Sequence, residues 1–207
     1  MPREALDYLR NIRTETLALV RSVTPAQAKF KPSRDSWSID QVLHHLFLTD
    51  KVWRDVISEL IAMEKAGKNP SIVKSFADLD TSVAGIPKPM LPFVEVPFTV
   101  MNYFLPPLAR EILLEYRIMP VQNPAAAAPS AGIPIKQLRE DLRDSYEDTS
   151  LLLKANPKAG YRRMRYSHPI LGVNNVPQLL RILALHEKRH QGQIRDILRA
   201  PGFPRAA

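Results

Sequence analysis

The chain has 207 residues and a formal net charge of +8 at neutral pH. This length fits a single domain, or one domain with an insertion. The chain contains no cysteine, which excludes disulfides, thiolate ligands and a cysteine nucleophile, so any metal must be held by histidine and carboxylate side chains. The positive charge permits binding to nucleic acid. However, the basic residues are spread along several segments, and we interpret them as a solvated surface with no nucleic-acid partner.

Neither end of the chain nor its most apolar stretch predicts a membrane segment. Residues 1–13 begin a charged amphipathic pattern and have no apolar signal-peptide core. The most apolar later stretch, residues 98–114, is interrupted by two adjacent prolines and by charged residues, so it does not resemble a membrane span. We therefore expect a cytoplasmic protein without a membrane partner.

Apolar residues at three- and four-residue spacing predict two amphipathic helices in the first third of the chain. The first covers about residues 5–23, and Thr24 can cap a short turn that follows it. The second begins sharply, because Ser38 and Gln41 have the spacing of a capping box. Its apolar stripe continues to about Lys65.

Residues 67–132 have a different composition and contain ten of the 19 prolines. Proline at this density excludes long regular helices and strands. We interpret the region as an ordered insertion that packs over the helices, with a short helix over about residues 107–117. The alternative is a disordered linker, but several aromatic residues in the region provide material to bury.

Two further amphipathic helices are predicted after this region. One begins near Pro134 and ends near Asn156, and the other covers residues 176–198. Four such helices, with a long connection between the second and the third, predict an all-α four-helix bundle. We expect residues 1–207 to form one domain, with residues 67–132 as its insertion.

The last helix carries two histidines, His186 and His190, four residues apart. At this spacing they lie one turn apart on one face of the helix. Leu183 and Ile194 share that face, so both imidazoles point toward the expected core, where polar groups need partners. Two histidines at this spacing, with Gln193 nearby, indicate a metal site.

The segment HEKRH, residues 186–190, matches the H-E-x-x-H pattern of zinc proteases. That pattern needs a third ligand, normally downstream, but residues 191–207 contain neither histidine nor glutamate. We therefore expect the third ligand upstream. Glu187 is then either a catalytic base or a solvated helix residue.

The second helix offers two adjacent histidines as the third ligand. His45 lies about 90° from the middle of the apolar stripe, whereas His44 lies about 170° away and should face solvent. Since these neighbours cannot both reach one core site, His45 is the better candidate. Three imidazoles leave coordination positions open, as in catalytic sites. Imidazole suits zinc, nickel, iron or copper, so the spacing does not select the metal.

Other polar residues are expected around this site. Gln41, four residues before His45, and Gln193 are candidate contacts to the ligands or to a substrate. We group these two with Glu187 as candidate catalytic residues. His168 precedes a proline and is therefore expected in extended or turn geometry at the rim of the site.

The segments WSIDQVLHHL, HPILG and HEKRHQGQI together resemble the DinB-like superfamily of metal-binding four-helix bundles. In the family pattern the first ligand is the histidine before leucine, here His45, and the other two correspond to His186 and His190. The resemblance implies a metal-dependent hydrolase, or an S-transferase that uses a low-molecular-weight thiol such as bacillithiol or mycothiol. It also implies a homodimer.

We therefore expect an enzyme in which three histidines hold a divalent transition metal, such as zinc, nickel or iron. The metal would activate either a thiol or a water molecule for attack on a small-molecule substrate. The alternative is a non-catalytic, stress-related bundle that stores or senses a metal or another small ligand.

Overall fold

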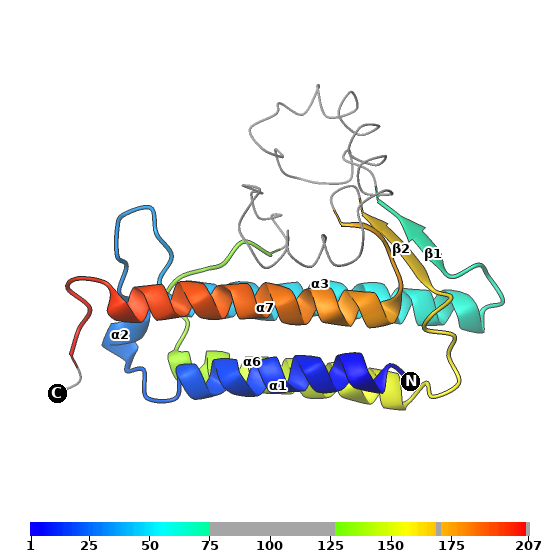
Figure 1. Ribbon diagram of the computed structural model, residues 1–207, viewed down its shortest axis with the longest axis horizontal. Coiled ribbons are helices and arrows are strands. Elements are labelled where there is room, and N and C mark those ends of the chain that lie inside the picture. Colours follow the sequence, from blue (N-terminus) through cyan, green and yellow to red (C-terminus); the bar gives the residue numbers. More distant parts are fainter. Residues whose placement is uncertain (75–126, 169–170, 206–207) are drawn as a thin grey trace, which may run out of the picture.

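The computed structural model describes residues 1–74, 127–168 and 171–205 (Figure 1). In these residues five helices pack as a bundle, and the bounds of the four long ones agree with the amphipathic segments predicted from the sequence. The four long helices are α1 (Arg3–Leu19), α3 (Ile39–Lys65), α6 (Ile135–Lys154) and α7 (Val176–Arg199), and the short α2 (Pro25–Lys29) follows α1. The helix predicted over residues 107–117 lies outside the described residues.

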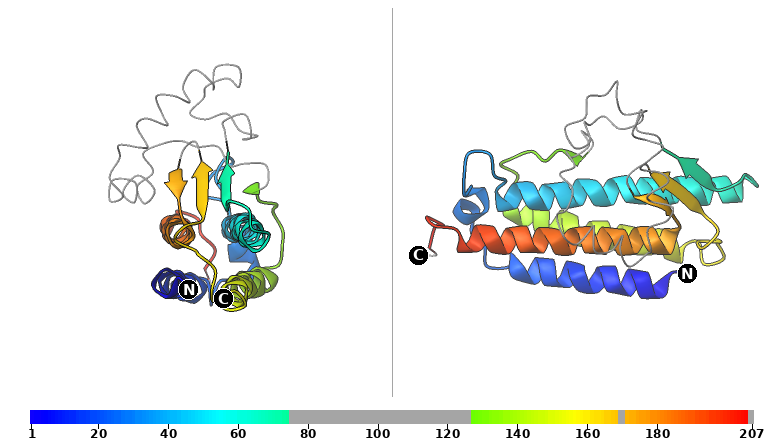
Figure 2. Two further views of the ribbon diagram at one scale, coloured as in Figure 1. Left: turned by 90° about the vertical axis from the view of Figure 1, so that its right-hand side faces the viewer. Right: turned by 45° about the horizontal axis from the view of Figure 1, so that its top comes forward.

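The four long helices form a ring of neighbours. Helix α1 packs against α6 and α7, and α3 packs against the same two helices, as the end-on view in Figure 2 shows. Helices α1 and α7 run in one direction, whereas α3 and α6 run in the other (Figure 1). Because α3 and α6 are parallel, the end of α3 and the start of α6 lie at opposite ends of the bundle (Figure 1).

Polar caps define the starts of two helices, as the sequence predicts. Thr24 and Gln27 form a capping box at α2, in which the Gln27 side chain accepts a hydrogen bond from the Thr24 N–H at 2.9 Å. At α3, the Gln41 side chain accepts from the Ser38 N–H at 3.3 Å. Helix α3 ends before Gly67, which has a φ of 69°, a conformation that glycine adopts without strain.

A small sheet corrects the all-α prediction. Strands β1 (Ser71–Val73), β2 (Arg165–His168) and β3 (Gly172–Asn174) lie in that order, with β1 parallel and β3 antiparallel to β2. Strands of three or four residues are too short to show the alternation that predicts a strand. Tyr166 of β2 packs edge-on against Trp53 of α3, with ring centroids 5.3 Å apart. His168 ends β2 in the extended geometry expected for it.

The core of the bundle consists of two apolar clusters separated by a polar layer. One cluster lies around the first turns of α7 and the other around its last turns. Between them, every long helix contributes buried polar side chains. These are Arg13, Thr16, Asp50, Ser145, Thr149, Ser150, Glu187 and Gln191.

No helix in the described part of the chain is both long enough and apolar enough to cross a membrane.

Candidate metal centre

His45 of α3 and His186 and His190 of α7 bring their Nε2 atoms together. The Nε2 atom of His186 lies 3.2 Å from that of His45 and 3.2 Å from that of His190. The candidate ligand atoms of all three residues lie within 4.8 Å of one another. His45 and His190 are buried, and His186 is partly exposed. The structure therefore assembles the three residues that the sequence predicts as metal ligands.

Oxygen atoms hold the outer ring nitrogens of two of these histidines. His45 Nδ1 lies 2.7 Å from the carbonyl oxygen of Ala127, and His190 Nδ1 lies 2.9 Å from Oε1 of Gln193. Because these oxygens accept hydrogen bonds, each Nδ1 carries the proton, and each Nε2 then presents a lone pair to the centre of the cluster. This arrangement is typical of metal-binding histidines, whose second nitrogen donates to an oxygen.

The third histidine makes the case for a cation stronger. His186 Nδ1 is buried and has no hydrogen-bond partner among the described residues. A neutral His186 ring carries one N–H proton. It can therefore donate to only one of the two Nε2 lone pairs that face it, those of His45 and His190. A cation at the centre would bind the lone pairs of all three residues. The donor set therefore fits a divalent transition metal, which imidazole nitrogen binds well.

Burial keeps two of these imidazoles, those of His45 and His186, in the neutral form that a metal ligand requires. It lowers the pKa of His45, and the nearby positive charge of Arg189 acts in the same direction. Burial also places the pKa of His186 well below its ordinary value, with further lowering from His190 and His45. Ligands that are already deprotonated near neutral pH need lose no proton before they bind a metal.

Trp37, directly before the cap of α3, forms an aromatic wall beside the cluster. Its ring lies nearly parallel to that of His190, at 6.2 Å between centroids and an interplanar angle of 12°, and 5.1 Å from the ring of His45. The helical pattern alone predicts no site role for Trp37. A signal is present, since Trp37 lies eight positions before His45, slightly more than two helical turns.

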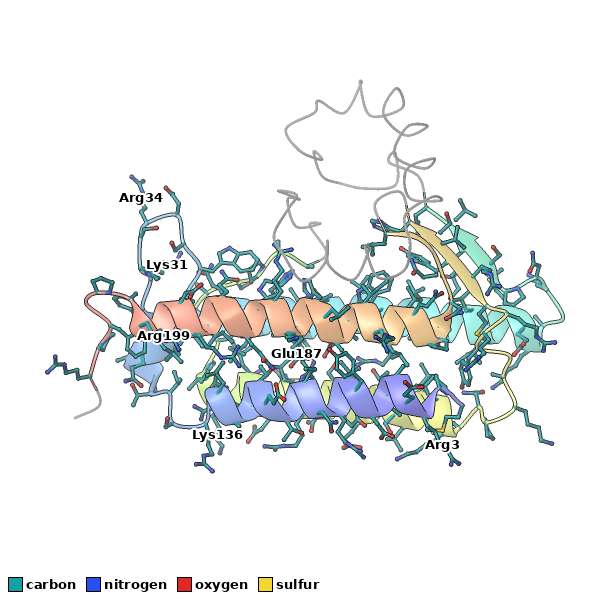
Figure 3. All side chains as sticks on the ribbon, viewed as in Figure 1. Arg3, Lys31, Arg34, Lys136, Glu187 and Arg199 are labelled. Carbon is teal, nitrogen blue, oxygen red and sulfur yellow. The ribbon has the colours of Figure 1, made fainter. Side chains whose placement is uncertain are left out.

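Glu187 lies on a different side of α7, between this helix and α1 (Figure 3). Its side chain is 1% exposed, so the prediction of a solvated residue is wrong. Both carboxylate oxygens bind Arg13, with distances of 2.8 Å to Nε and 2.9 Å to Nη2. Since one residue corresponds to about 100° around a helix, the neighbour of His186 turns away from the cluster. Its contacts give no support to a role as catalytic base.

Arg13 connects Glu187 to the rest of the polar layer. Its Nη2 also lies 2.7 Å from Oδ2 of Asp50, and its Nη1 donates to the carbonyl oxygen of Leu142 on α6. Burial lowers the pKa of Arg13, but the two carboxylates outweigh this effect and the net shift is upward. Burial raises the pKa of Asp50, against the opposing charge of Arg13. One guanidinium thus joins all four long helices.

The remaining predicted residues have distinct positions. Gln193 contacts the cluster through His190, as described above. Gln41 instead directs its side-chain oxygen to the start of α3. His44 was expected to face solvent, but its Nδ1 accepts a hydrogen bond from the N–H of Ser130 at 2.9 Å. His168 is outside the cluster, as expected.

Comparison with protein families is consistent with this geometry. The family model described as the DinB superfamily matches residues 8–194. The chain belongs to the DinB superfamily. The matched range begins within α1, ends within α7 and contains all three histidines. Searches of curated proteins and of solved structures found no significant match. What is established is the superfamily and a buried three-histidine cluster that is consistent with a metal site.

Proposed function

We propose that this member of the DinB superfamily is a metal-dependent enzyme, with His45, His186 and His190 as the ligands of zinc, nickel or iron. The observation that carries the proposal is the convergence of three Nε2 atoms while two of the outer nitrogens are held by oxygen acceptors. No acidic side chain of the described residues joins the group. Three protein ligands leave coordination positions for a substrate, as in catalytic sites.

The bound ion would supply positive charge that lowers the pKa of a thiol or a water molecule at the site. The protein's own groups prepare the site for this chemistry. Ala127 and Gln193 fix the orientations of His45 and His190. Trp37 covers one side of these two rings, which excludes water there and offers a flat apolar surface to a substrate.

Two reactions are consistent with this site. In the first, a low-molecular-weight thiol loses its proton and its sulfur displaces a leaving group, such as halide, from an electrophilic carbon of a small molecule, so that the enzyme is an S-transferase. In the second, water attacks the carbonyl carbon of an ester or amide and releases the alcohol or amine, so that the enzyme is a hydrolase. We also propose that the protein acts on small-molecule substrates and forms a homodimer. Analytical ultracentrifugation tests the homodimer separately. The alternative class is a bundle that binds a metal without turnover.

The first experiment is the metal content of the purified protein, measured by mass spectrometry. We expect near-stoichiometric metal in the wild type and its loss in His45→Ala, His186→Ala and His190→Ala. His168→Asn is the control, because it removes a histidine that lies outside the cluster. Metal in the wild type that all three ligand variants retain would contradict the site.

Turnover then separates the proposed functions. Metal-loaded protein is incubated with a thiol and an aryl halide to detect thioether formation, and with activated esters and amides, without thiol, to detect hydrolysis. Activity that is lost with the metal and in His190→Ala supports an enzyme. Stoichiometric metal without turnover in either assay would favour the binding protein.

A further inference from the structure

Residues 127–132, here called the strap, lie directly before α6 and contact the first two turns of α3. Three hydrogen bonds hold them there. The Ala127 carbonyl accepts from His45 Nδ1 at 2.7 Å, the Ser130 N–H donates to His44 Nδ1 at 2.9 Å, and the Gly132 N–H donates to Oδ2 of Asp40 at 2.8 Å. One end of the strap therefore contacts a proposed metal ligand, and the other end is held by a carboxylate.

Asp40 is well suited to anchor the strap. Its side chain is 1% exposed. Besides the Gly132 bond, the carboxylate accepts from the Gln41 N–H at 2.8 Å and from the Ser38 hydroxyl. A carboxylate in the first turn of a helix is favoured by the unpaired N–H groups there. Asp40 thus ties the strap to the most firmly capped part of α3.

The backbone of the strap is adapted to this anchor. Gly132 has a φ of 85°, in the left-handed region that other residues rarely adopt. In this conformation its N–H donates to Asp40, two residues before Pro134, the cap of α6. The opposite end of the strap can then occupy few positions, because the six residues from Ala127 to Gly132 form one short connection.

We propose that Asp40 is a positioning residue of the metal centre. By fixing the strap, it holds the Ala127 carbonyl against His45 Nδ1 and so keeps the proton on that nitrogen. The Nε2 lone pair of His45 then stays available. Without the carbonyl, the ring can move its proton to Nε2 and donate to His186, 3.2 Å away, and in that form it cannot bind a metal through Nε2. This inference rests on the proposed role of His45 as a ligand.

The test uses Asp40→Ala, with Asn175→Ala as the matched control. Asn175 caps α7 by accepting from the Gln178 N–H at 3.0 Å, so its loss also removes a helix cap, but one about 15 Å along the helix from His186. Asp40→Asn keeps an acceptor for the Gly132 N–H and serves as the conservative variant. If Asp40→Ala does not fold, Asp40→Ser replaces it, since a hydroxyl on this shorter side chain does not reach Gly132.

Two measurements are made on each variant. In metal-free protein with ¹⁵N-labelled histidine, long-range proton–nitrogen NMR spectra at about pH 8 report the tautomer of His45, because the imidazoles are neutral well above a pKa of about 6.5. Titration with Co²⁺, followed by its visible absorption, reports affinity. We expect the Nδ1–H tautomer in the wild type and Asn175→Ala, and a shift toward Nε2–H in Asp40→Ala. Co²⁺ affinity should fall about 10- to 100-fold in Asp40→Ala. It should fall less in Asp40→Asn and stay unchanged in Asn175→Ala.

The outcomes separate this inference from the proposed function. An unchanged His45 tautomer and unchanged Co²⁺ affinity in Asp40→Ala would overturn the inference and leave the metal site intact. An Nε2–H tautomer in the wild type would overturn it as well. If Asp40→Ala shifts the tautomer while wild-type protein binds no Co²⁺, the positioning of His45 is supported and the proposed metal site fails.

Discussion

His186 and Glu187 are adjacent in the sequence, yet they belong to two different buried polar regions. His186 joins the histidine cluster between α3 and α7. Glu187 joins the polar layer between α7 and α1 (Figure 3). In the polar layer, donors meet acceptors: the Arg13 guanidinium contacts Glu187, Asp50 and the Leu142 carbonyl. In the histidine cluster, acceptor nitrogens face one another, and one outer nitrogen lacks a partner among the described residues.

This difference distinguishes a structural polar group from a site prepared for a ligand. Buried polar groups are almost always paired, and the polar layer obeys this rule within the protein itself. In the histidine cluster, the three inward-facing Nε2 lone pairs are all bound only if a cation is added. The two regions should therefore respond differently to mutation, to metal and to pH.

The largest effect is expected when the polar layer loses its cation. Arg13→Ala leaves two carboxylates buried without a partner, which should reduce the free energy of unfolding by about 3–5 kcal/mol. Denaturation with guanidinium chloride measures this. Arg10→Ala is the control, because Arg10 pairs with Asp7 at the surface and both side chains are more than half exposed; its loss should have little effect. Similar stability of the two variants would show that the layer does not hold the helices together.

A second change separates the benefit of the ion pairs from the cost of breaking them. In the triple variant Arg13→Met, Asp50→Leu and Glu187→Met, no buried charge remains unpaired. Such replacements are often neutral or stabilising, so this variant should recover most of the stability that Arg13→Ala loses. A triple variant as unstable as Arg13→Ala would indicate that the ion pairs themselves stabilise the fold.

A metal bound at the histidine cluster should stabilise the folded protein. The polar layer should give no such effect. At a free Zn²⁺ concentration 100 times its Kd, the free energy of unfolding of the wild type should rise by about 2.7 kcal/mol. His186→Ala should show no such rise, because two imidazoles remain. Thermal unfolding with and without Zn²⁺ measures the difference. An equal rise in His186→Ala would place the bound ion elsewhere.

Much of this arrangement could be predicted from the sequence, because it depends on local patterns. Helical periodicity located the long helices, and the angle around α3 selected His45 over His44. The spacing of His186 and His190 determined their common face. Each of these inferences uses only residues within a few turns of one helix, where geometry is fixed by hydrogen bonding.

The features that the sequence did not predict depend on contacts between distant segments. The partner of Glu187 is Arg13, which lies on another helix 174 positions away. The acceptor for His45 is a backbone carbonyl, at Ala127, and carries no side-chain signal. Strand β1 pairs with β2 across 94 positions, from Ser71 to Arg165. Such pairings follow from the packing of the whole bundle.

Acid should weaken the metal-free protein through its buried histidines. Burial lowers the pKa of His168 to about 4, from an ordinary value of 6.5. The unfolded chain therefore binds a proton as the pH falls below 6.5 while the folded protein does not. Stability is then lost between pH 6.5 and 4, by at most about 2 kcal/mol from pH 7 to 5 for this residue.

Chemical denaturation of chelator-treated protein at these two pH values measures the loss, and His168→Asn should reduce it. The lowered pKa values of His45 and His186 act with the same sign, so part of the loss should remain in the variant. Zn²⁺ should reduce the part of the stability loss that comes from His45 and His186, but not the part that comes from His168. An identical pH dependence in wild type and His168→Asn would exclude the assigned contribution of His168.

The smallest effect is optical, and it locates the ion without changing stability. The chain has two tryptophans. Trp37 packs on His45 and His190. Trp53 packs on Tyr166 and lies about 12 Å further along α3 than His45. Quenching by a bound Co²⁺ ion falls steeply with distance, so the ion should quench Trp37 more strongly. Fluorescence titrations should therefore show strong quenching in Trp53→Phe and weak quenching in Trp37→Phe. The reverse order would place the ion near the small sheet, and would make the histidine cluster, like the polar layer, a structural feature of the bundle.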